Sequence, residues 1–414
     1  MAACTLSMEG STAAPDRASR WAVLAAYGLL AATTQLLWLT FAPITTQAAG
    51  ALHVDVGTAG DLAVIFPLVY IVLALPFGRL LDAHFRSALG AGAALTGLGA
   101  VVRALDPASF GFQLAGQAVI AVAQPLVLNS ITKIAAANFP ERERATAISI
   151  GTVALFVGIL AAVLSGGPLF AVGGLRLVLW SQGAVALAVM ALMLTALSLL
   201  GAGTEEAAAA VSVRSLLADR LLWRLAILVF LGMGIYNAVA TWLEAILDHF
   251  GRGSTAGDLI AIMTLGGVAG AAVLPSLAAA RDRRRAFLLL ALAATAAAYP
   301  LLALRQDLAW AATVLFLDGF LLMACLPVVL DWSDVHTSGR RQGEATGFLL
   351  LAGNLGGVVL ALAVQLLLGS PYAALISIAA CALIGLPAAL GLPAAIRGAS
   401  ARTSAPAPAE SSST

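Results

Sequence analysis

Long apolar segments dominate this chain and restrict what it can fold into. A helix needs about 20 predominantly apolar residues to cross the hydrocarbon core of a bilayer. Hydrophobic residues make up 61% of the 414 residues and charged residues only 10%, against roughly 45–50% and about 25% in soluble domains. The sequence therefore predicts an all-α integral membrane protein. Twelve transmembrane helices are expected, at 21–47, 58–81, 88–105, 110–136, 145–169, 174–200, 222–248, 256–279, 284–304, 308–333, 342–369 and 371–396.

A polar stretch at 201–221 divides these segments six and six. It predicts an N-terminal six-helix half at 20–200, a linker at 201–221 and a C-terminal six-helix half at 222–397. The two tails, 1–19 and 398–414, are polar and compositionally simple, so we expect both to be disordered.

Two patterns of the first half return in the second. The run from Gln124 to Asn129 (QPLVLN) is echoed by LPVVLD, which ends at Asp331, and each run leads through a charged turn into a further apolar segment. The tetrapeptide AGDL occurs at 59–62 and again at 256–259. Repetition near half the chain length predicts two pseudo-symmetric halves, an arrangement typical of secondary transporters.

The distribution of basic residues predicts the orientation. With the N-terminus in the cytoplasm, only four of the 22 Lys and Arg residues fall on outer loops, which leaves 18 on the inner side. Inner loops of membrane proteins carry such an excess, so both termini and the linker are expected to be cytoplasmic. The Ala-rich, Lys-poor composition favours a bacterial inner membrane. The four outer residues are Arg103, Arg176, Arg252 and Arg305.

The loop between the second and third segments resembles a motif of the major facilitator superfamily. It reads GRLLDAHFR from Gly78 to Arg86, and in that superfamily its acid at Asp82 and base at Arg86 act as a latch at the cytoplasmic face. The resemblance implies the twelve-helix fold and alternating access. The second copy has Arg281 where Asp82 stands, although Asp282 could take its role; plain positive-inside charge is the alternative.

Within that superfamily the chain resembles the feline leukaemia virus subgroup C receptor family, transporters linked to choline, ethanolamine and haem. The shared residues are spaced identities in apolar helices: Arg20-Trp21, Gly116-Gln117, Ala123-Gln124, Ile134-Ala135, Phe139 and GIYNA from Gly234 to Ala238.

This second resemblance implies four substrate-binding positions. The family's Trp and first Gln match Trp38 and Gln124. Its Tyr position falls on Asn237, with Tyr236 one residue earlier, and its second Gln position falls nearest Asn354. Because two of the four residue types differ, the family's substrate does not follow from the resemblance.

The polar residues inside the predicted helices support a central pathway independently. Polar side chains in a spanning helix are costly unless they face a partner or a cavity. Gln35 and Trp38 share a face of the first helix; other polar groups follow faces of the fourth, seventh and eleventh. A central substrate cavity is favoured, and hydrogen bonds between neighbouring helices are the alternative for any single residue. These groups are Gln113, Gln117 and Gln124, then Asn237, Thr241 and Glu244 beside Trp242, and Asn354.

The expected cavity suits a neutral or cationic solute, since amides and aromatic faces line it without a central base. Trp38, Tyr236 and Trp242 could attract a choline-like amine by cation–π interaction; Trp242 could instead be an interfacial anchor.

Charged residues suggest gating and coupling roles. An ion pair between Lys133 and Asp331 would form an inner gate, with simple snorkelling of the lysine as the alternative. Asp318 and Glu244 are candidates to carry a proton; otherwise Asp318 is a hydrogen-bonded structural acid or a counter-charge. Without a coupling acid, facilitated uniport is the natural mechanism.

Other classes of protein fit less well. The sequence has no HExxH, GxSxG or phosphate-loop motif, so we expect no enzyme. No cofactor, metal or disulfide is expected, and the net charge of +1 gives no nucleic-acid-binding surface. The expected partners are the lipid bilayer and a small-molecule substrate, with a monomer as the working unit. Two alternatives stay open: a proton-coupled exporter of metabolites or drugs, and a non-transporting receptor or sensor.

Overall fold

In a computed structural model of the chain, the described residues are 17–199, 217–252, 255–305, 307–337 and 341–394. They form helices joined by short turns. In the N-terminal half these are α1 (Arg17–Trp38), the 3-10 turn η1 (Ala42–Ile44), α2 (Thr45–Leu52), α3 (Val56–Ala83), α4 (Phe85–Leu105), α5 (Phe110–Leu128), α6 (Ile131–Asn138) and α7 (Glu141–Leu199).

The C-terminal half continues from α9 to α16. Its helices are α9 (Arg220–Asp248), α10 (Ala256–Ala280), α11 (Arg284–Leu304), α12 (Leu308–Leu322), α13 (Cys325–Thr337), α14 (Gln342–Gln365), α15 (Pro371–Ile384) and α16 (Leu386–Leu390). Helices suit this chain because a bilayer offers no hydrogen-bond partners, and a helix satisfies its own backbone.

Twelve membrane crossings result, as the sequence predicts. Eleven helical stretches in the described part are long and apolar enough to span, and one of them, Glu141–Ser198, is long enough for two crossings. The chain reverses within α7 at Gly173 and Gly174, which have non-helical dihedral angles. Gly174 has a φ of 62°, a conformation that glycine adopts without steric cost.

Three of the crossings are broken, and the sequence did not predict these breaks. The fourth crossing consists of α5 and α6, separated at Asn129 and Ser130, and the tenth consists of α12 and α13, separated at Met323 and Ala324. A third, the twelfth, has a one-residue break at Gly385, between α15 and α16. At the first break, the Asn129 side chain accepts a hydrogen bond from Tyr70 and donates one to the carbonyl oxygen of Ala74. These bonds tie the fourth crossing to α3.

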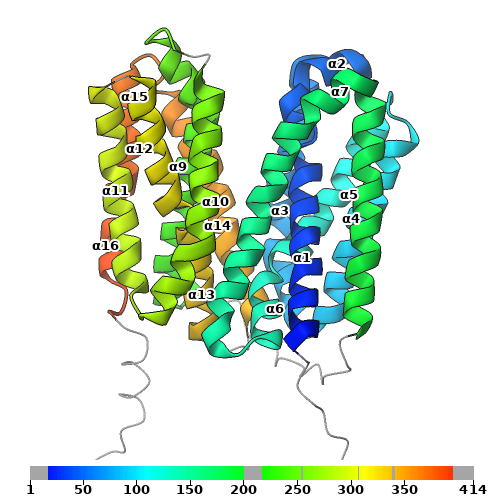
Figure 1. Cartoon of the computed structure of the whole chain (residues 1–414), viewed down its shortest axis with the longest axis horizontal. Helices are drawn as coiled ribbons and strands as arrows, with labels where there is room; N and C mark the ends of the chain where they lie inside the picture. The colour runs from blue at the N-terminus through cyan, green and yellow to red at the C-terminus, as the bar shows by residue number, and fades with distance from the viewer. Residues whose placement is uncertain (1–16, 200–216, 253–254, 306, 338–340, 395–414) are drawn as a thin grey trace, which may run out of the picture.

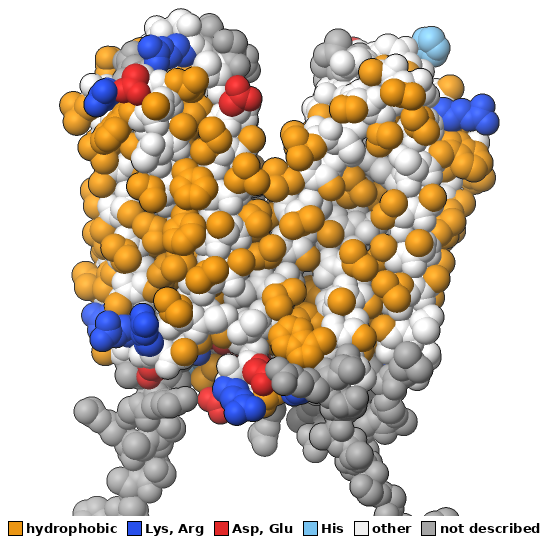
Figure 2. Space-filling model, viewed as in Figure 1, with side chains coloured by type: hydrophobic (Ala, Val, Ile, Leu, Met, Phe, Trp, Pro, Cys, Tyr) orange, Lys and Arg blue, Asp and Glu red, His pale blue; other side chains and the backbone are white. Residues whose placement is uncertain are grey.

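The two halves form separate bundles that meet at one end (Figure 1). We call this the closed end; α1 begins there and α16 ends there. Contacts between the halves join α3 to α14, and α7 to α10 and α13. At the opposite end, the open end, the bundles diverge, and Figure 2 shows the molecule hollowed between them. A cleft between the halves thus opens to one side only.

Candidate functional site

Asp82 links the two halves at the closed end. It lies in the last turn of α3 in the N-terminal half, and its two carboxylate oxygens accept hydrogen bonds from the backbone N–H groups of Gly343 and Glu344, both at 3.0 Å. These N–H groups open α14 in the C-terminal half. A helix N-terminus carries a partial positive charge and unpaired donors, so the acid of one half caps a helix of the other.

Further polar bonds cross between the halves around this cap. Arg79 lies 3.1 Å from Glu344, and Arg144 lies 3.5 Å from Asp334. In both pairs the N-terminal half supplies the base and the C-terminal half the acid. Two hydroxyl pairs also cross here, Thr132 with Thr346 at 2.6 Å and Thr146 with Ser276 at 2.9 Å.

Small residues let α3 and α14 approach closely beneath these bonds. A Cβ atom added to Gly78 would lie 2.6 Å from the carbonyl oxygen of Gly343, and one added to Gly347 would lie 2.6 Å from that of Ala74. Both helices therefore use small residues four positions apart, a pattern that brings membrane helices into backbone contact.

Lys133 and Asp331 do not pair in the arrangement considered from the sequence. Lys133 lies 3.2 Å from Asp82 in its own half, and Asp331 lies 2.6 Å from Arg284 in its own half. The two ion pairs thus have opposite polarity. In the first half the acid lies at the junction of α3 and α4, and in the second half the base lies at the junction of α10 and α11. Arg86, the expected latch base, donates to the carbonyl oxygen of Leu197.

Trp38 ends α1 and contacts the neighbouring helix α3. Its indole N–H donates to the carbonyl oxygen of Ala63 at 3.0 Å. In a regular helix the carbonyl oxygen of Ala63 would accept from the N–H of residue 67. That residue is Pro67, which has no N–H, so the Ala63 carbonyl is available to Trp38. The Trp38 ring is half-buried beside Phe66, with 6.2 Å between centroids.

Gln35 and Gln124 are buried amides of a different kind. They are 4% and 5% exposed, and neither side chain has a hydrogen-bond partner among the residues described here. Neither residue contributes to the fully buried side-chain N and O atoms that lack a partner, so both amides keep some contact with open space and have unused capacity to bind a polar molecule.

Gln117 forms hydrogen bonds within the N-terminal half, and its assignment to the substrate site stays a prediction. Its Oε1 accepts from Arg103 at 3.0 Å, and its Nε2 donates to the carbonyl oxygen of Leu62 at 3.2 Å. Arg103 was expected on an outer loop. Instead it is fully buried inside the N-terminal half, where it also donates to Leu37, Thr40 and Gln182.

The neighbouring residues of α5 accommodate this arginine. A Cβ atom at Gly116 would lie only 2.4 Å from the Cγ of Arg103, so the glycine makes room for the arginine stem. Gln113 donates to the carbonyl oxygens of Arg103 and Asp106. The glutamine stripe of the fourth helix, interpreted from the sequence as a pathway, thus serves buried packing at Gln113 and Gln117.

The candidate residues of the C-terminal half are partly buried. Tyr236 shares a hydrogen bond with Thr264 at 3.1 Å, and the indole of Trp242 donates to the carbonyl oxygen of Ala361 at 2.8 Å. Asn354 donates to the carbonyl oxygen of Leu350 in its own helix, at 2.9 Å. Asn237 packs against α14, where a Cβ atom at Gly357 would lie 2.3 Å from its amide nitrogen. The Glu244 side chain lies outside the described part of the structure.

Asp318 is enclosed within the C-terminal half. It is 2% exposed and accepts hydrogen bonds from Thr295 at 2.7 Å and Tyr299 at 2.8 Å, both on α11. This geometry corresponds to the hydrogen-bonded structural acid considered from the sequence.

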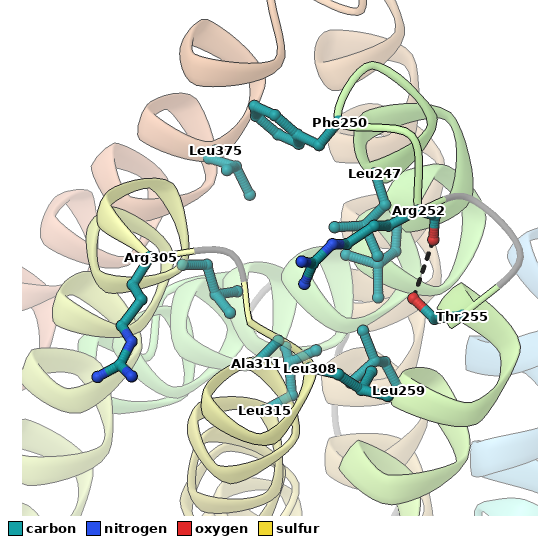
Figure 3. A pocket seen from close by; sticks show the side chains of 12 residues that line it. Leu247, Phe250, Arg252, Thr255, Leu259, Arg305, Leu308, Ala311, Leu315 and Leu375 are labelled. Atoms are coloured by element: carbon teal, nitrogen blue, oxygen red, sulfur yellow. Dashed lines mark hydrogen bonds between the residues drawn. The ribbon is translucent and has the colours of Figure 1, made fainter.

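A small pocket lies at the open end of the C-terminal half (Figure 3). Its enclosed volume is about 20 Å³, roughly the room needed for one water molecule. Leucine side chains form most of its wall, and Arg252 and Arg305 lie at its edge. Its size makes it a packing gap.

The match to a family model now decides the relationship. The model described as "Major Facilitator Superfamily" matches residues 23–361. The chain belongs to the Major Facilitator Superfamily. This confirms the first resemblance drawn from the Gly78 to Arg86 loop, and the proteins of this superfamily are transporters, not enzymes.

Several relatives within this superfamily are carriers by name. Solute carrier family 49 member A3 of Danio rerio is 32% identical over 278 residues, which cover 62% of this chain and 58% of that protein. The Xenopus tropicalis protein of the same name is 27% identical over 82% of this chain and 76% of its own length. A choline/ethanolamine transporter of Rattus norvegicus is 29% identical, over 34% of this chain and 26% of that protein.

Solved structures of this superfamily share the fold. The chain resembles the E. coli fucose:proton symporter with a TM-score of 0.70 and 14% identity, over 90% of this chain and 97% of the symporter. It also resembles a bacterial homologue of the iron transporter ferroportin, with a TM-score of 0.71 and 14% identity, over 90% and 98%. At this identity the likeness concerns the fold alone.

Among the residues that the structure describes, no group of three or more His, Cys, Asp or Glu side chains could hold a metal ion.

Proposed function

We propose that the chain is a monomeric secondary transporter for a small neutral or cationic organic solute, choline-like or another amine. The solute would cross the cell's inner membrane by alternating access through the cleft between the halves. The observation that carries this proposal is the pair of amides at Gln35 and Gln124, which keep slight exposure within the spans and have no hydrogen-bond partner among the described residues. Such groups can bind a polar ligand without first breaking a hydrogen bond to the protein, so they gain the full free energy of the new bond.

The charges near the spans favour a solute without net negative charge. A negatively charged solute would need a free base in the cleft. Arg103 is instead enclosed within the N-terminal half, and Lys133 and Arg144 are bound to acids at the closed end. Trp38, with its N–H already bonded to Ala63, offers its ring face, and an amine over such a face gains about 0.5–2 kcal/mol.

The relatives support the same substrate class. The rat relative is named as a choline/ethanolamine transporter, and Trp38 and Gln124 match two of the four pocket positions implied by the resemblance to that family. Asn237 and Asn354 stand at the other two, so we propose an altered pocket that keeps the preference for amines and changes the substituents accepted.

We further propose that the closed end faces the cytoplasm. The excess of Lys and Arg on that side supports this orientation, and the structure then corresponds to an outward-open state. Transport requires the Asp82 cap and the bonds of Arg79 and Arg144 to break while the open end closes. A substrate drives this exchange only by binding one state more tightly than the other.

The test is a thermal-shift screen of the purified chain against choline, ethanolamine, betaine, haem and neutral metabolites. A ligand that binds the native state raises the melting temperature by mass action. We expect an amine to stabilise the protein and Trp38→Ala to lose at least about tenfold in affinity, a loss equal to about 1.4 kcal/mol.

The matched control is Trp180→Ala, which removes an indole that is 55% exposed on α7. It should keep the full shift. Flux of the same amine into proteoliposomes separates a transporter from a receptor that only binds. Silence from every amine, with a shift from an acidic metabolite, would contradict the proposed substrate class.

A further inference from the structure

The turn between α10 and α11 carries four arginines within five residues. We call Arg281, Arg283, Arg284 and Arg285 the arginine turn. Arg284 points inward and binds Asp331 and Asp282. The other three have no acid within ion-pair distance in the described part of the chain, and the Nε–H of Arg285 is buried without a hydrogen-bond partner.

The closed end of the N-terminal half differs in this respect. Arg79, Lys133, Arg142 and Arg144 each lie within 4 Å of a carboxylate, at 3.1, 3.2, 3.7 and 3.5 Å. These four bases are compensated by acids, whereas three of the four arginines of the arginine turn are not, among the described residues. Figure 2 shows a group of basic side chains at that end of the C-terminal bundle, at the level where α11 begins.

The start of α11 adds to this positive field. Its first turn contains no acid, and no side chain caps it. Because a helix N-terminus carries a partial positive charge, arginines there repel the helix dipole. An anion at this corner would relieve both the repulsion and the unpaired charge.

Apolar side chains continue from the arginine turn toward the middle of the membrane. Val273 and Leu277 on α10 are 55% and 45% exposed, and Leu290 on α11 is 57% exposed. A ligand with a phosphate at one end and hydrocarbon at the other matches this sequence of surfaces. Inorganic phosphate or nucleic acid would leave the apolar part unused.

We propose that the arginine turn binds the headgroup of an anionic phospholipid. The phosphate lies against Arg281, Arg283 and Arg285, and the acyl chains run along Val273, Leu277 and Leu290. The site is separate from the proposed substrate pathway, because none of these residues belongs to the set assigned to substrate binding.

The experiment is native mass spectrometry of the full chain in detergent, titrated with phosphatidylglycerol or phosphatidylcholine of identical acyl chains. Basic residues at a membrane surface each strengthen binding of anionic lipid about fivefold. We expect phosphatidylglycerol to bind on the order of 100-fold more tightly than phosphatidylcholine. The variant with Arg281→Gln, Arg283→Gln and Arg285→Gln should lose this preference, and added salt should weaken it.

Arg142→Gln is the matched control, since this arginine is 85% exposed at the closed end of the other half; it should keep the preference. If the triple variant fails to fold, Arg283→Gln alone should cost about fivefold. Equal binding of the two lipids, or a preference that survives in the triple variant, would overturn the proposal. Displacement of the lipid by millimolar inorganic phosphate would overturn the lipid as the ligand.

Discussion

Two glutamines of one helix have opposite environments. Gln117 accepts a hydrogen bond from the buried Arg103 and donates to Leu62, whereas Gln124, two turns along α5, has no hydrogen-bond partner in the described residues. The first belongs to the structure of the N-terminal half, and the second is free to serve a ligand. Their substitution should therefore give opposite signatures.

We expect Gln117→Leu to lower the free energy of unfolding by about 2–3 kcal/mol, because a buried arginine loses an acceptor. Gln124→Leu should leave the unfolding free energy unchanged or raised, and should abolish the thermal shift by the bound amine. Melting temperatures with and without the amine measure both effects. Equal destabilisation by the two substitutions would show that Gln124 is also structural.

At this scale the sequence indicates which residues are unusual in the spans, but it does not predict their hydrogen-bond partners. Trp38 and Gln124 stand out because polar and aromatic groups are rare in the spans. Arg103 was assigned to a loop because it closes an apolar run near Asp106; only the packing of α4 on α5 shows that it turns inward. Periodicity gives the face of a helix and does not say which neighbour that face meets.

At the scale of elements, the crossing of α3 and α14 determines how tightly the closed end shuts. The helices touch through Ala74 and Gly78 on one side and Gly343 and Gly347 on the other. A methyl group at this crossing must push the helices apart, because the nearest atoms are backbone.

We expect Gly347→Ala to shift the population toward a state open at this end. Its Cβ would lie 2.6 Å from the carbonyl oxygen of Ala74, and overpacking costs about 1–3 kcal/mol. Thiol labelling of Thr132→Cys, in a chain without its native cysteines, should become at least about fivefold faster. Gly60→Ala on α3, with no atom within 4 Å, should leave the labelling rate unchanged; an equal increase there would contradict the role of the crossing.

The sequence predicted the elements better than their interruptions. Twelve spans and the reversal between 169 and 174 follow from apolar length and glycine. The breaks at Asn129 and Met323 do not follow, since Pro125 lies before the first and Pro327 after the second. Tertiary bonds, such as those of Asn129 to Tyr70 and Ala74, determine where each helix parts.

At the scale of the whole molecule, the bonds across the closed end hold one of two required states. Thr132 and Thr346 come from opposite halves, and their hydroxyl oxygens lie 2.6 Å apart. Cysteines at these positions would bring two sulfur atoms together only while this end is closed.

We expect the Thr132→Cys, Thr346→Cys chain to lose transport on oxidation and to regain it with a reductant. Amine binding should persist in the oxidised protein, because the open end still admits the solute. Proteoliposome flux measures transport, and thermal shift measures amine binding. Each single cysteine variant is the control for both. Full transport by the oxidised chain would show that the halves do not separate here.

The polar character of the closed end determines what happens when it opens. Its partners are carboxylates, guanidinium groups, hydroxyls and helix N–H groups, and each can exchange its bond for one to water at a small net cost. The polar groups on the parted surfaces are then hydrated, so breaking these bonds adds little to the free energy of opening. Water thus replaces the bonds between the halves, and the closed and the open arrangement of this end can remain close in free energy.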